Sequence, residues 1–129
     1  MLHNPDDLKY TKTHEWVRTK NGVIEAGITD FAQRQLSDIT HVELPELNRH
    51  LDAGEEAVVV ESIKAAAAVY APIAGTIVEV NEALVPAPEV INSDPFGTGW
   101  IFRMNPDHAD DVDALLSAEA YEANLPAEH

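Results

Sequence analysis

The amino-acid sequence predicts a mainly β fold, a sandwich or a barrel built from short strands. Three observations favour it: the strand-like segments are short, their apolar residues alternate or are β-branched, and turn residues separate them. With 129 residues, the chain has the length of one domain with its own hydrophobic core. The segments that we expect to form strands span residues 14–19, 23–28, 40–44, the two apolar parts of 56–72, 76–80 and 100–104.

The first half of the chain predicts a hairpin followed by a short helix. Asn21 and Gly22 adopt positive φ readily, so they are expected to join the first two strands. Asp30 is expected to cap a helix over residues 31–36. The strand after this helix should end at Pro45, which has no backbone N–H to donate to a neighbouring strand.

The stretch from Glu56 to Pro72 is compatible with two structures. Its apolar segments lie on either side of Lys64, and the first is rich in valine, so we interpret it as strand, tight turn and strand. The alternative is a helix over residues 62–70, because the four consecutive alanines at 65–68 are strong helix formers. Helix propensity alone favours the second structure.

The second half of the chain returns to the β core and then becomes helical. Residues 92–99 are rich in turn formers and precede the last expected strand. Beyond Pro106, apolar residues recur at helical spacing, which predicts one broken or continuous helix over about residues 107–125. We therefore expect a single domain over residues 1–129, with its β core at about residues 10–104.

Composition and charge exclude several classes of function. The chain has no cysteine, so neither disulfides nor thiolate metal ligands can form. Its formal net charge of −15 repels phosphate backbones, so we expect partners with basic faces and no nucleic acid. No apolar run approaches the roughly 18 residues of a membrane-spanning helix. Residues 1–10 have neither a signal-peptide core nor the composition of a transit peptide, so we expect a cytoplasmic protein without a membrane partner.

The histidines and carboxylates show no spacing that is typical of a metal site or an enzyme. His14 and Glu15 lack the second histidine, four residues on, that a zinc-binding helix needs. His41 and His50 lie nine residues apart. Neither a Gly-x-Ser-x-Gly nucleophile motif nor a phosphate-binding glycine loop occurs. We therefore expect neither a metal ligand nor a catalytic residue.

Lys64 is the residue whose placement points to chemistry. It is the only lysine beyond residue 20, and it lies where a tight turn would more often use glycine, asparagine or aspartate. A lysine at such a turn, beside small alanines, is accessible to an enzyme that attaches an acyl group to its amine. Glu61 adds a carboxylate that this enzyme can recognise. An ordinary surface lysine is the alternative.

Short motifs along the whole chain match one known family. The matching segments are residues 10–17 (YTKTHEWV), 27–30 with 32–33, 42–45, 60–65 (VESIKA), 70–72, 80–82, 91–92 with 94–95, 99–100, 115–116 and 120–121. In the order and spacing of these segments, from about Tyr10 to Tyr121, the chain resembles the glycine cleavage H proteins. The motif around Lys64 would by itself be only moderately specific.

The resemblance implies a fold and a cofactor. The fold is a barrel-sandwich hybrid of the lipoyl- and biotinyl-carrier type, with a short internal helix and a C-terminal helix, in a single lipoyl-carrier domain. Lys64 is then at the tip of a hairpin, which favours the strands over the helix at that point. The implied cofactor is lipoate, joined by an amide to the side-chain nitrogen of Lys64 as a long arm that ends in a dithiolane.

The resemblance also implies a function and its partners. The chain would be a noncatalytic carrier that receives the aminomethyl group of glycine from a pyridoxal-phosphate-dependent glycine decarboxylase, the P-protein. A tetrahydrofolate-dependent aminomethyltransferase, the T-protein, would take this group, and dihydrolipoyl dehydrogenase, the L-protein, would reoxidise the arm. A lipoyl-attaching enzyme is a further implied partner, and we expect the carrier to be a monomer. Covalent tethering keeps the effective concentration of the arm high at each visit.

Glu15 and Thr13 are implied to dock the loaded arm. A carboxylate can pair with the ammonium of the aminomethyl group, while an exposed strand glutamate is the alternative for Glu15. The chain departs from the family pattern at Ala68, where many members have an aspartate that helps to hold the loaded arm. We therefore expect weaker docking here or a greater dependence on Glu15.

Other carriers and another role compete with this interpretation. Biotin carriers usually flank their lysine with methionines, and the lipoyl domains of 2-oxoacid dehydrogenases flank it with aspartate and alanine. Residues 63–65, Ile-Lys-Ala, resemble neither closely. A lipoyl relay to other complexes, or an unmodified H-like adaptor, is the alternative function.

Overall fold

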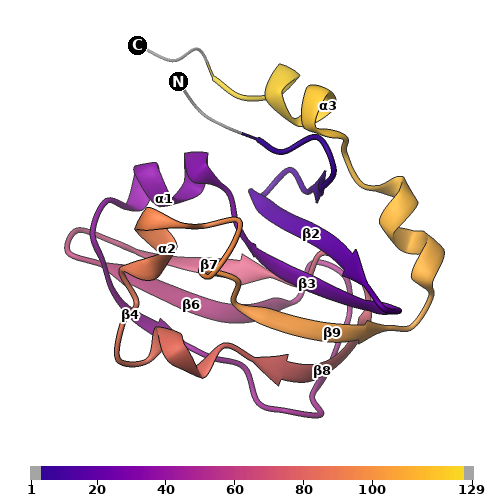
Figure 1. Cartoon of the computed structure of the whole chain (residues 1–129), viewed down its shortest axis with the longest axis horizontal. Coiled ribbons are helices and arrows are strands. Elements are labelled where there is room, and N and C mark those ends of the chain that lie inside the picture. Colours follow the sequence, from indigo (N-terminus) through magenta and orange to yellow (C-terminus); the bar gives the residue numbers. More distant parts are fainter. Residues whose placement is uncertain (1–3, 127–129) are drawn as a thin grey trace.

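The computed structural model describes residues 4–126, which form two antiparallel β-sheets that pack face to face (Figure 1). The larger sheet has six strands in the linear order β1-β2-β3-β9-β8-β5, and the smaller has three in the order β4-β6-β7. The strands are β1 Lys9–Tyr10, β2 Glu15–Lys20, β3 Val23–Ile28, β4 Ile39–Glu43, β5 His50–Leu51, β6 Glu56–Ser62, β7 Ala66–Tyr70, β8 Gly75–Val80 and β9 Phe102–Pro106. The predicted mainly β fold is confirmed, as two facing sheets rather than one closed barrel.

The main apolar core lies between the two sheets. Side chains that alternate along each strand point into it, as period-two alternation requires. In β6, Val58 and Val60 are buried, whereas Glu61 is exposed. The larger sheet contributes, among others, Val17, Ile24, Ile77, Phe102 and Met104.

The stretch around Lys64 is a hairpin, as the strand interpretation predicted. β6 and β7 pair in antiparallel register, with Val58 opposite Val69 and Val60 opposite Ala67. This arrangement buries the three valines in the core. Burying a valine side chain contributes about 1.5–3 kcal/mol, which exceeds the few tenths of a kcal/mol per residue by which alanine favours a helix. Tertiary packing therefore overrides the helix propensity of the four alanines.

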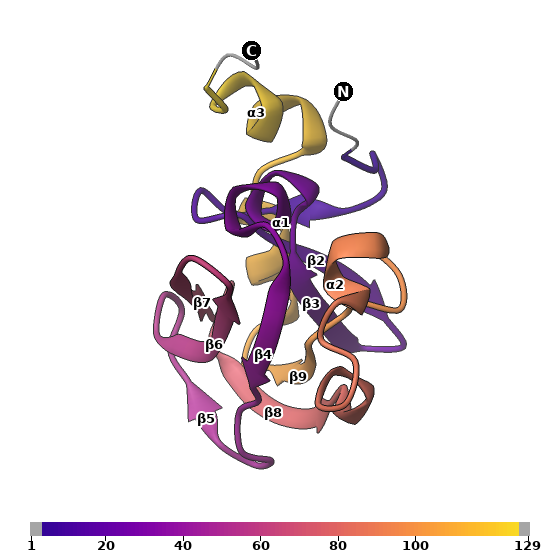
Figure 2. The same cartoon turned by 90° about the vertical axis from the view of Figure 1, so that its left-hand side faces the viewer.

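Short helices connect the strands and cover the ends of the sheets (Figure 2). They are α1 Asp30–Leu36, the 3-10 helix η1 Glu82–Leu84, α2 Val90–Ser93, the 3-10 helix η2 Ala109–Ala114, and α3 Ala118–Ala123. The predicted cap of α1 is wrong by one residue, because Thr29 rather than Asp30 accepts the Ala32 N–H through its side chain, over 3.3 Å. The Asp30 carboxylate instead accepts from the Gln33 side chain over 2.7 Å.

The C-terminal helix is broken at two leucines. Leu115 is extended, and Leu116 exchanges two backbone hydrogen bonds of 2.8 Å each with Tyr10. Ser117 then caps α3 by accepting the Ala120 N–H over 3.2 Å. The helical spacing that predicted this segment thus spans two helices and the extended link between them.

A second, smaller apolar cluster joins the two ends of the described chain. It contains Leu8, Tyr10, Trp16, Ala118 and Tyr121. The Tyr10 and Tyr121 rings stack with centroids 4.8 Å apart, so α3 packs against the N-terminal segment and the start of β2.

Two of the differences from the sequence-based prediction lie just before the last strand. The last strand begins at Phe102 rather than Trp100, because the Asn81 side chain donates to the Trp100 carbonyl over 2.7 Å and occupies it. The expected turn-rich loop at residues 92–99 overlaps the end of α2. Within residues 4–126, no helix is long and apolar enough to cross a membrane.

Candidate functional site

Lys64 lies at the exposed tip of the hairpin between β6 and β7. The turn is closed by the Ser62 N–H, which donates to the Ala65 carbonyl over 2.7 Å. The Ser62 hydroxyl oxygen accepts from the N–H groups of Lys64, over 3.3 Å, and of Ala65, over 3.1 Å. Neither Ile63 nor Lys64 has a positive φ. The serine therefore stabilises a turn that needs no glycine or asparagine, and the central positions are free to carry other side chains.

The backbone of this turn is attached to the connection between α1 and β4. The Ile63 N–H donates to the Asp38 carbonyl over 3.2 Å. Asn92 holds the residues on both sides of Asp38: its amide donates to the Ser37 carbonyl over 2.7 Å and accepts from the Ile39 N–H over 3.0 Å. The turn is thus held in place through its main chain, while the Lys64 side chain extends from it into solvent.

Glu15, at the start of β2, is buried, with only 1% of its surface exposed. One carboxylate oxygen accepts from the hydroxyls of Thr11 and Thr13, and the other accepts from the Tyr70 N–H over 3.1 Å. Burial raises the pKa of this carboxyl, and the hydrogen bonds from Thr11, Thr13 and Tyr70 act against that rise. The alternative of an exposed strand glutamate is therefore wrong.

The two buried carboxylates of the described chain have different partners. Glu25 pairs with Arg18 over 2.8 Å and with Arg103 over 2.7 Å, so its charge is balanced within the sheet. Glu15 has only hydroxyl and N–H partners, and no basic side chain in residues 4–126 forms an ion pair with it. Buried charges in proteins are generally paired. Glu15 is therefore a carboxylate that a cationic ligand could neutralise.

Glu15 lies in the wall of an open groove of about 530 Å³. Tyr70, Ala71 and Pro72 lie on one side of it, and Leu115 and Leu116 are contributed by the extended link between η2 and α3. The full lining is Tyr10, Thr11, Lys12, Thr13, Glu15, Gly54, Tyr70, Ala71, Pro72, Ala114, Leu115 and Leu116. The groove thus combines a mostly apolar wall with one buried carboxylate.

The structure brings Glu15 and Thr13 together but places Lys64 elsewhere. Lys64 precedes β7, and Tyr70, whose N–H binds Glu15, is the last residue of that strand. Glu61 is exposed near the turn, opposite Ala66. Lys64 and the groove are therefore near opposite ends of one strand.

Ala68 lies on β7 between the turn and the groove. It is half-buried, pairs with Val59, and is not part of the groove lining. Side chains alternate along a strand, so Ala68 shares a face of β7 with Tyr70.

Sequence reasoning missed the opposite wall of the groove. The spacing of Leu115 and Leu116 predicted only a helix. They line the groove because Leu116 forms a β-bridge with Tyr10. Thr11 was not singled out either, although its hydroxyl binds Glu15. Both threonines reach Glu15 because residues 11–14 form a tight turn, with a positive φ at His14, immediately before β2.

The histidines have structural contacts. The His14 Nδ1 lies 2.7 Å from the Tyr121 hydroxyl, which lies 2.8 Å from the Thr29 hydroxyl. Burial lowers the pKa of His14 and raises the pKa of Tyr121 to about 12. This network attaches α3 to the start of α1. No group of three or more residues within 4–126 is arranged to hold a metal ion.

Comparison with known proteins decides the family. A family model described as glycine cleavage H-protein matches residues 8–128 of this chain. The chain belongs to the glycine cleavage H-protein family.

Relatives of known name agree over nearly their whole length. The glycine cleavage system H protein of Acinetobacter baylyi is 51% identical over 124 residues, which cover 96% of this chain and 100% of that protein. The glycine cleavage system H protein of Thermus thermophilus is 52% identical over 124 residues, which cover 96% and 97% of the two chains.

A solved structure agrees as well. The crystal structure of a glycine cleavage system H protein from Mycobacterium marinum superposes with a TM-score of 0.86 at 38% identity, covering 93% of this chain and 97% of that one. The similarity confirms the lipoyl-carrier type of fold. As an H protein, the chain is a carrier subunit rather than a catalyst.

Proposed function

We propose that this H protein carries lipoate as an amide on the side-chain nitrogen of Lys64 and shuttles the aminomethyl group of glycine. The observation that carries the proposal is the presentation of Lys64, with an exposed side chain on a turn whose backbone is held by Ser62 and Asp38. When bound, lipoate supplies a dithiolane that accepts the aminomethyl group and is reduced as it does so. The carrier contributes attachment, orientation and protection.

The residues present fit such an arm. A flexible arm attached at Lys64 would have to run along β7 to reach the groove at the other end of that strand. There the side chains of Tyr70, Leu115 and Leu116 offer an apolar wall for the hydrocarbon and sulfur atoms. Apolar contact favours docking of the arm over its exposure to water.

Glu15 is proposed to hold the aminomethyl group of the docked arm. Thr11 and Thr13 fix the orientation of its carboxylate, and the ammonium would form the ion pair with Glu15 that no basic side chain of residues 4–126 forms, although Lys12 also lines the groove. A charge-assisted hydrogen bond is about twice as strong as a neutral one, and burial strengthens it further. Docking would also shield the labile carbon–sulfur bond from water.

The absence of an aspartate at residue 68 is proposed to weaken this docking. The Ala68 side chain offers no hydrogen bond between the turn and the groove, so Glu15 is the one carboxylate of the docking site in residues 4–126. Retention of the aminomethyl group should therefore depend more strongly on Glu15 in this chain than in family members that have the aspartate.

The proposed partners are those of the glycine cleavage reaction. They are the P-protein decarboxylase, the T-protein aminomethyltransferase, the L-protein dihydrolipoyl dehydrogenase and the enzyme that attaches lipoate. We propose that the H protein meets them as a monomer in the cytoplasm. Glu61, exposed near the turn, is proposed as a carboxylate that the attaching enzyme recognises. The net charge of −15 favours basic surfaces on these partners.

Peptide mapping and reconstitution test the proposal. Intact mass and peptide mapping of the protein from its native cell should show lipoyl on Lys64. Reconstitution with the three partner enzymes should give glycine oxidation that the Lys64→Arg variant abolishes, because that variant keeps the positive charge but cannot form the amide. An unmodified Lys64 in the native protein, or glycine oxidation that does not depend on Lys64, would reject the carrier function.

The same reconstitution separates the alternative role. A lipoyl relay would show transfer of the lipoyl group from Lys64 to an acceptor domain and no Lys64-dependent glycine oxidation. An unmodified adaptor would show neither reaction.

A further inference from the structure

Ile63, the neighbour of Lys64, is the most exposed large hydrophobic residue in the described part of the chain. Its exposed fraction is 70%, compared with 61% for Val85, 55% for Leu47 and 45% for Val78. An exposed isoleucine contributes nothing to the core, and turns are usually built from glycine, asparagine, aspartate, serine or proline. The fold itself thus gives no reason for this side chain at this position.

The turn holds Ile63 in a fixed place relative to Lys64. The Ile63 N–H donates to the Asp38 carbonyl over 3.2 Å, and Asn92 fixes the residues on either side of Asp38. The main chain at Ile63 is therefore held before any partner arrives. A residue whose main chain is already held loses less freedom on binding than one on a loose loop, which favours its use as a contact.

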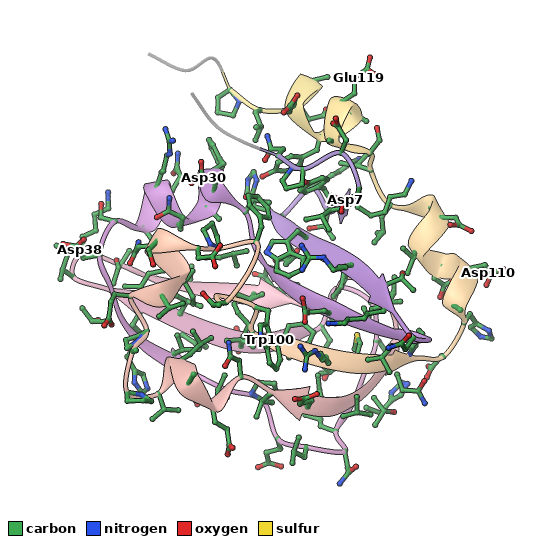
Figure 3. The ribbon with its side chains drawn as sticks, viewed as in Figure 1. Asp7, Asp30, Asp38, Trp100, Asp110 and Glu119 are labelled. Atoms are coloured by element: carbon green, nitrogen blue, oxygen red, sulfur yellow. The ribbon has the colours of Figure 1, made fainter. Side chains whose placement is uncertain are left out.

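Acidic groups surround this apolar side chain. Asp38 and Glu61 are both exposed near the turn, and Asp38 lies at the end of the molecule where the β6–β7 turn projects (Figure 3). The tip thus presents one apolar side chain and one amine with carboxylates beside them. An enzyme that closes over the amine must cover Ile63 as well.

We propose that Ile63 is a specificity determinant for lipoylation, which inserts into an apolar pocket beside the acceptor-lysine channel of the lipoyl-attaching enzyme. The proposal rests on Lys64 being the attachment site. In the reaction considered, lipoate and ATP give lipoyl-adenylate and pyrophosphate on the enzyme. The neutral Lys64 amine attacks the acyl carbon, the amide C–N bond forms, the bond to the AMP phosphate oxygen breaks, and AMP and a proton leave. Ile63 takes no part in these steps and acts only by positioning Lys64.

The test compares enzymatic and chemical acylation of the same variants. Initial rates of lipoylation by a lipoate–protein ligase, supplied with lipoate and ATP, are measured for wild type, Ile63→Ser and Ile63→Val. We expect kcat/KM to fall about tenfold for Ile63→Ser and less than about threefold for Ile63→Val, mainly through KM, since an apolar contact contributes in proportion to its buried area. The variants Val85→Ser and Leu47→Ser remove other exposed apolar side chains and should react as wild type does.

Chemical acylation by a small activated ester, read by peptide mapping at Lys64, separates recognition from reactivity. Its rate should be the same in wild type and Ile63→Ser. Equal enzymatic rates for these two proteins would overturn the role of Ile63 and leave Lys64 as the carrier residue. A parallel fall in the chemical rate would also overturn it, because Ile63 would then act on the amine itself. Failure of the ligase to modify wild-type Lys64 would reject both the carrier function and this inference.

Discussion

Replacement of Glu15 by glutamine tests the docking of cargo most directly, because it removes the charge and preserves the shape. In wild type the carboxylate accepts from Thr11, Thr13 and the Tyr70 N–H. A glutamine oxygen can still accept from Tyr70, and its amide can donate to the threonine hydroxyls, which can reorient to accept. The variant should therefore fold, with a free energy of unfolding within about 1 kcal/mol of wild type.

The loss of charge should nevertheless shorten the lifetime of the loaded arm. A hydrogen bond to a charged group contributes about 1.5–3 kcal/mol. The groove is open on one side, so we take the lower figure, which corresponds to roughly a tenfold difference in a rate or an equilibrium. The glutamine oxygen is already used by the Tyr70 N–H, so it cannot replace the carboxylate as an acceptor for the ammonium.

The assay follows decay of the aminomethylated protein in buffer without partner enzymes. Hydrolysis of the loaded arm releases formaldehyde and ammonia, and either can be measured with time. Glu119, exposed on α3, supplies the matched control, since Glu119→Gln removes one negative charge from a residue that does not line the groove. Identical decay for wild type and Glu15→Gln would show that Glu15 does not hold the cargo.

The same pair of proteins has a predicted dependence on pH. Burial raises the pKa of Glu15 above its ordinary value of 4.5, so the folded state binds this proton more tightly than the unfolded state. The contribution of Glu15 to the stability of wild type should therefore fall as pH rises from about 4.5 through the raised pKa and stay level beyond it. Glutamine does not titrate. Chemical denaturation at several pH values should show that the free energy of unfolding of the glutamine variant rises relative to that of wild type across this window. An opposite trend would contradict the burial effect.

Three further substitutions have defined outcomes. Ala68→Asp should slow hydrolysis of the loaded arm severalfold, and a decay rate equal to wild type would remove the proposed role of this position. Asn92→Ala should lower the free energy of unfolding by about 1–3 kcal/mol, because two part-buried backbone groups lose their partner, and should speed amide hydrogen exchange at Ile63 as measured by NMR. Unchanged exchange at Ile63 would show that Asn92 does not hold the turn. Tyr121→Phe should cost about 1–2 kcal/mol in thermal unfolding, since its hydroxyl binds His14 and Thr29, whereas an unchanged melting temperature would assign α3 docking to ring packing alone.

The sequence was sufficient for most of the local structure, where patterns lie close together along the chain. Alternation and turn residues placed most of the strands, and the turn that contains Lys64, within a residue or two. The alanine run at residues 65–68 was ambiguous, because the choice between helix and strand depends on valines that become buried only when both sheets are present. The helix propensity of the alanines is a local property and contains no information about that burial.

The candidate groove could not be predicted in the same way. Glu15 had to be weighed as an exposed residue, since its burial depends on segments remote along the chain: the Tyr70 N–H binds it, and residues 114–116 line the same groove. The two leucines of the opposite wall were spaced as in a helix. They line the groove only because Leu116 pairs with Tyr10, more than one hundred residues away.

Because β7 lies between Lys64 and the groove, its length sets the distance that the proposed lipoyl arm must span. The strand runs from Ala66 to Tyr70, about 13 Å at ~3.3 Å per residue. Two residues inserted in β7, with two more in β6 to preserve the pairing, would keep the alternation of faces and move Lys64 about 7 Å farther from Glu15. One inserted residue would reverse the faces of the strand and disturb the core. The hairpin can therefore change its reach only in steps of two residues, which ties the carrier to an arm of one length.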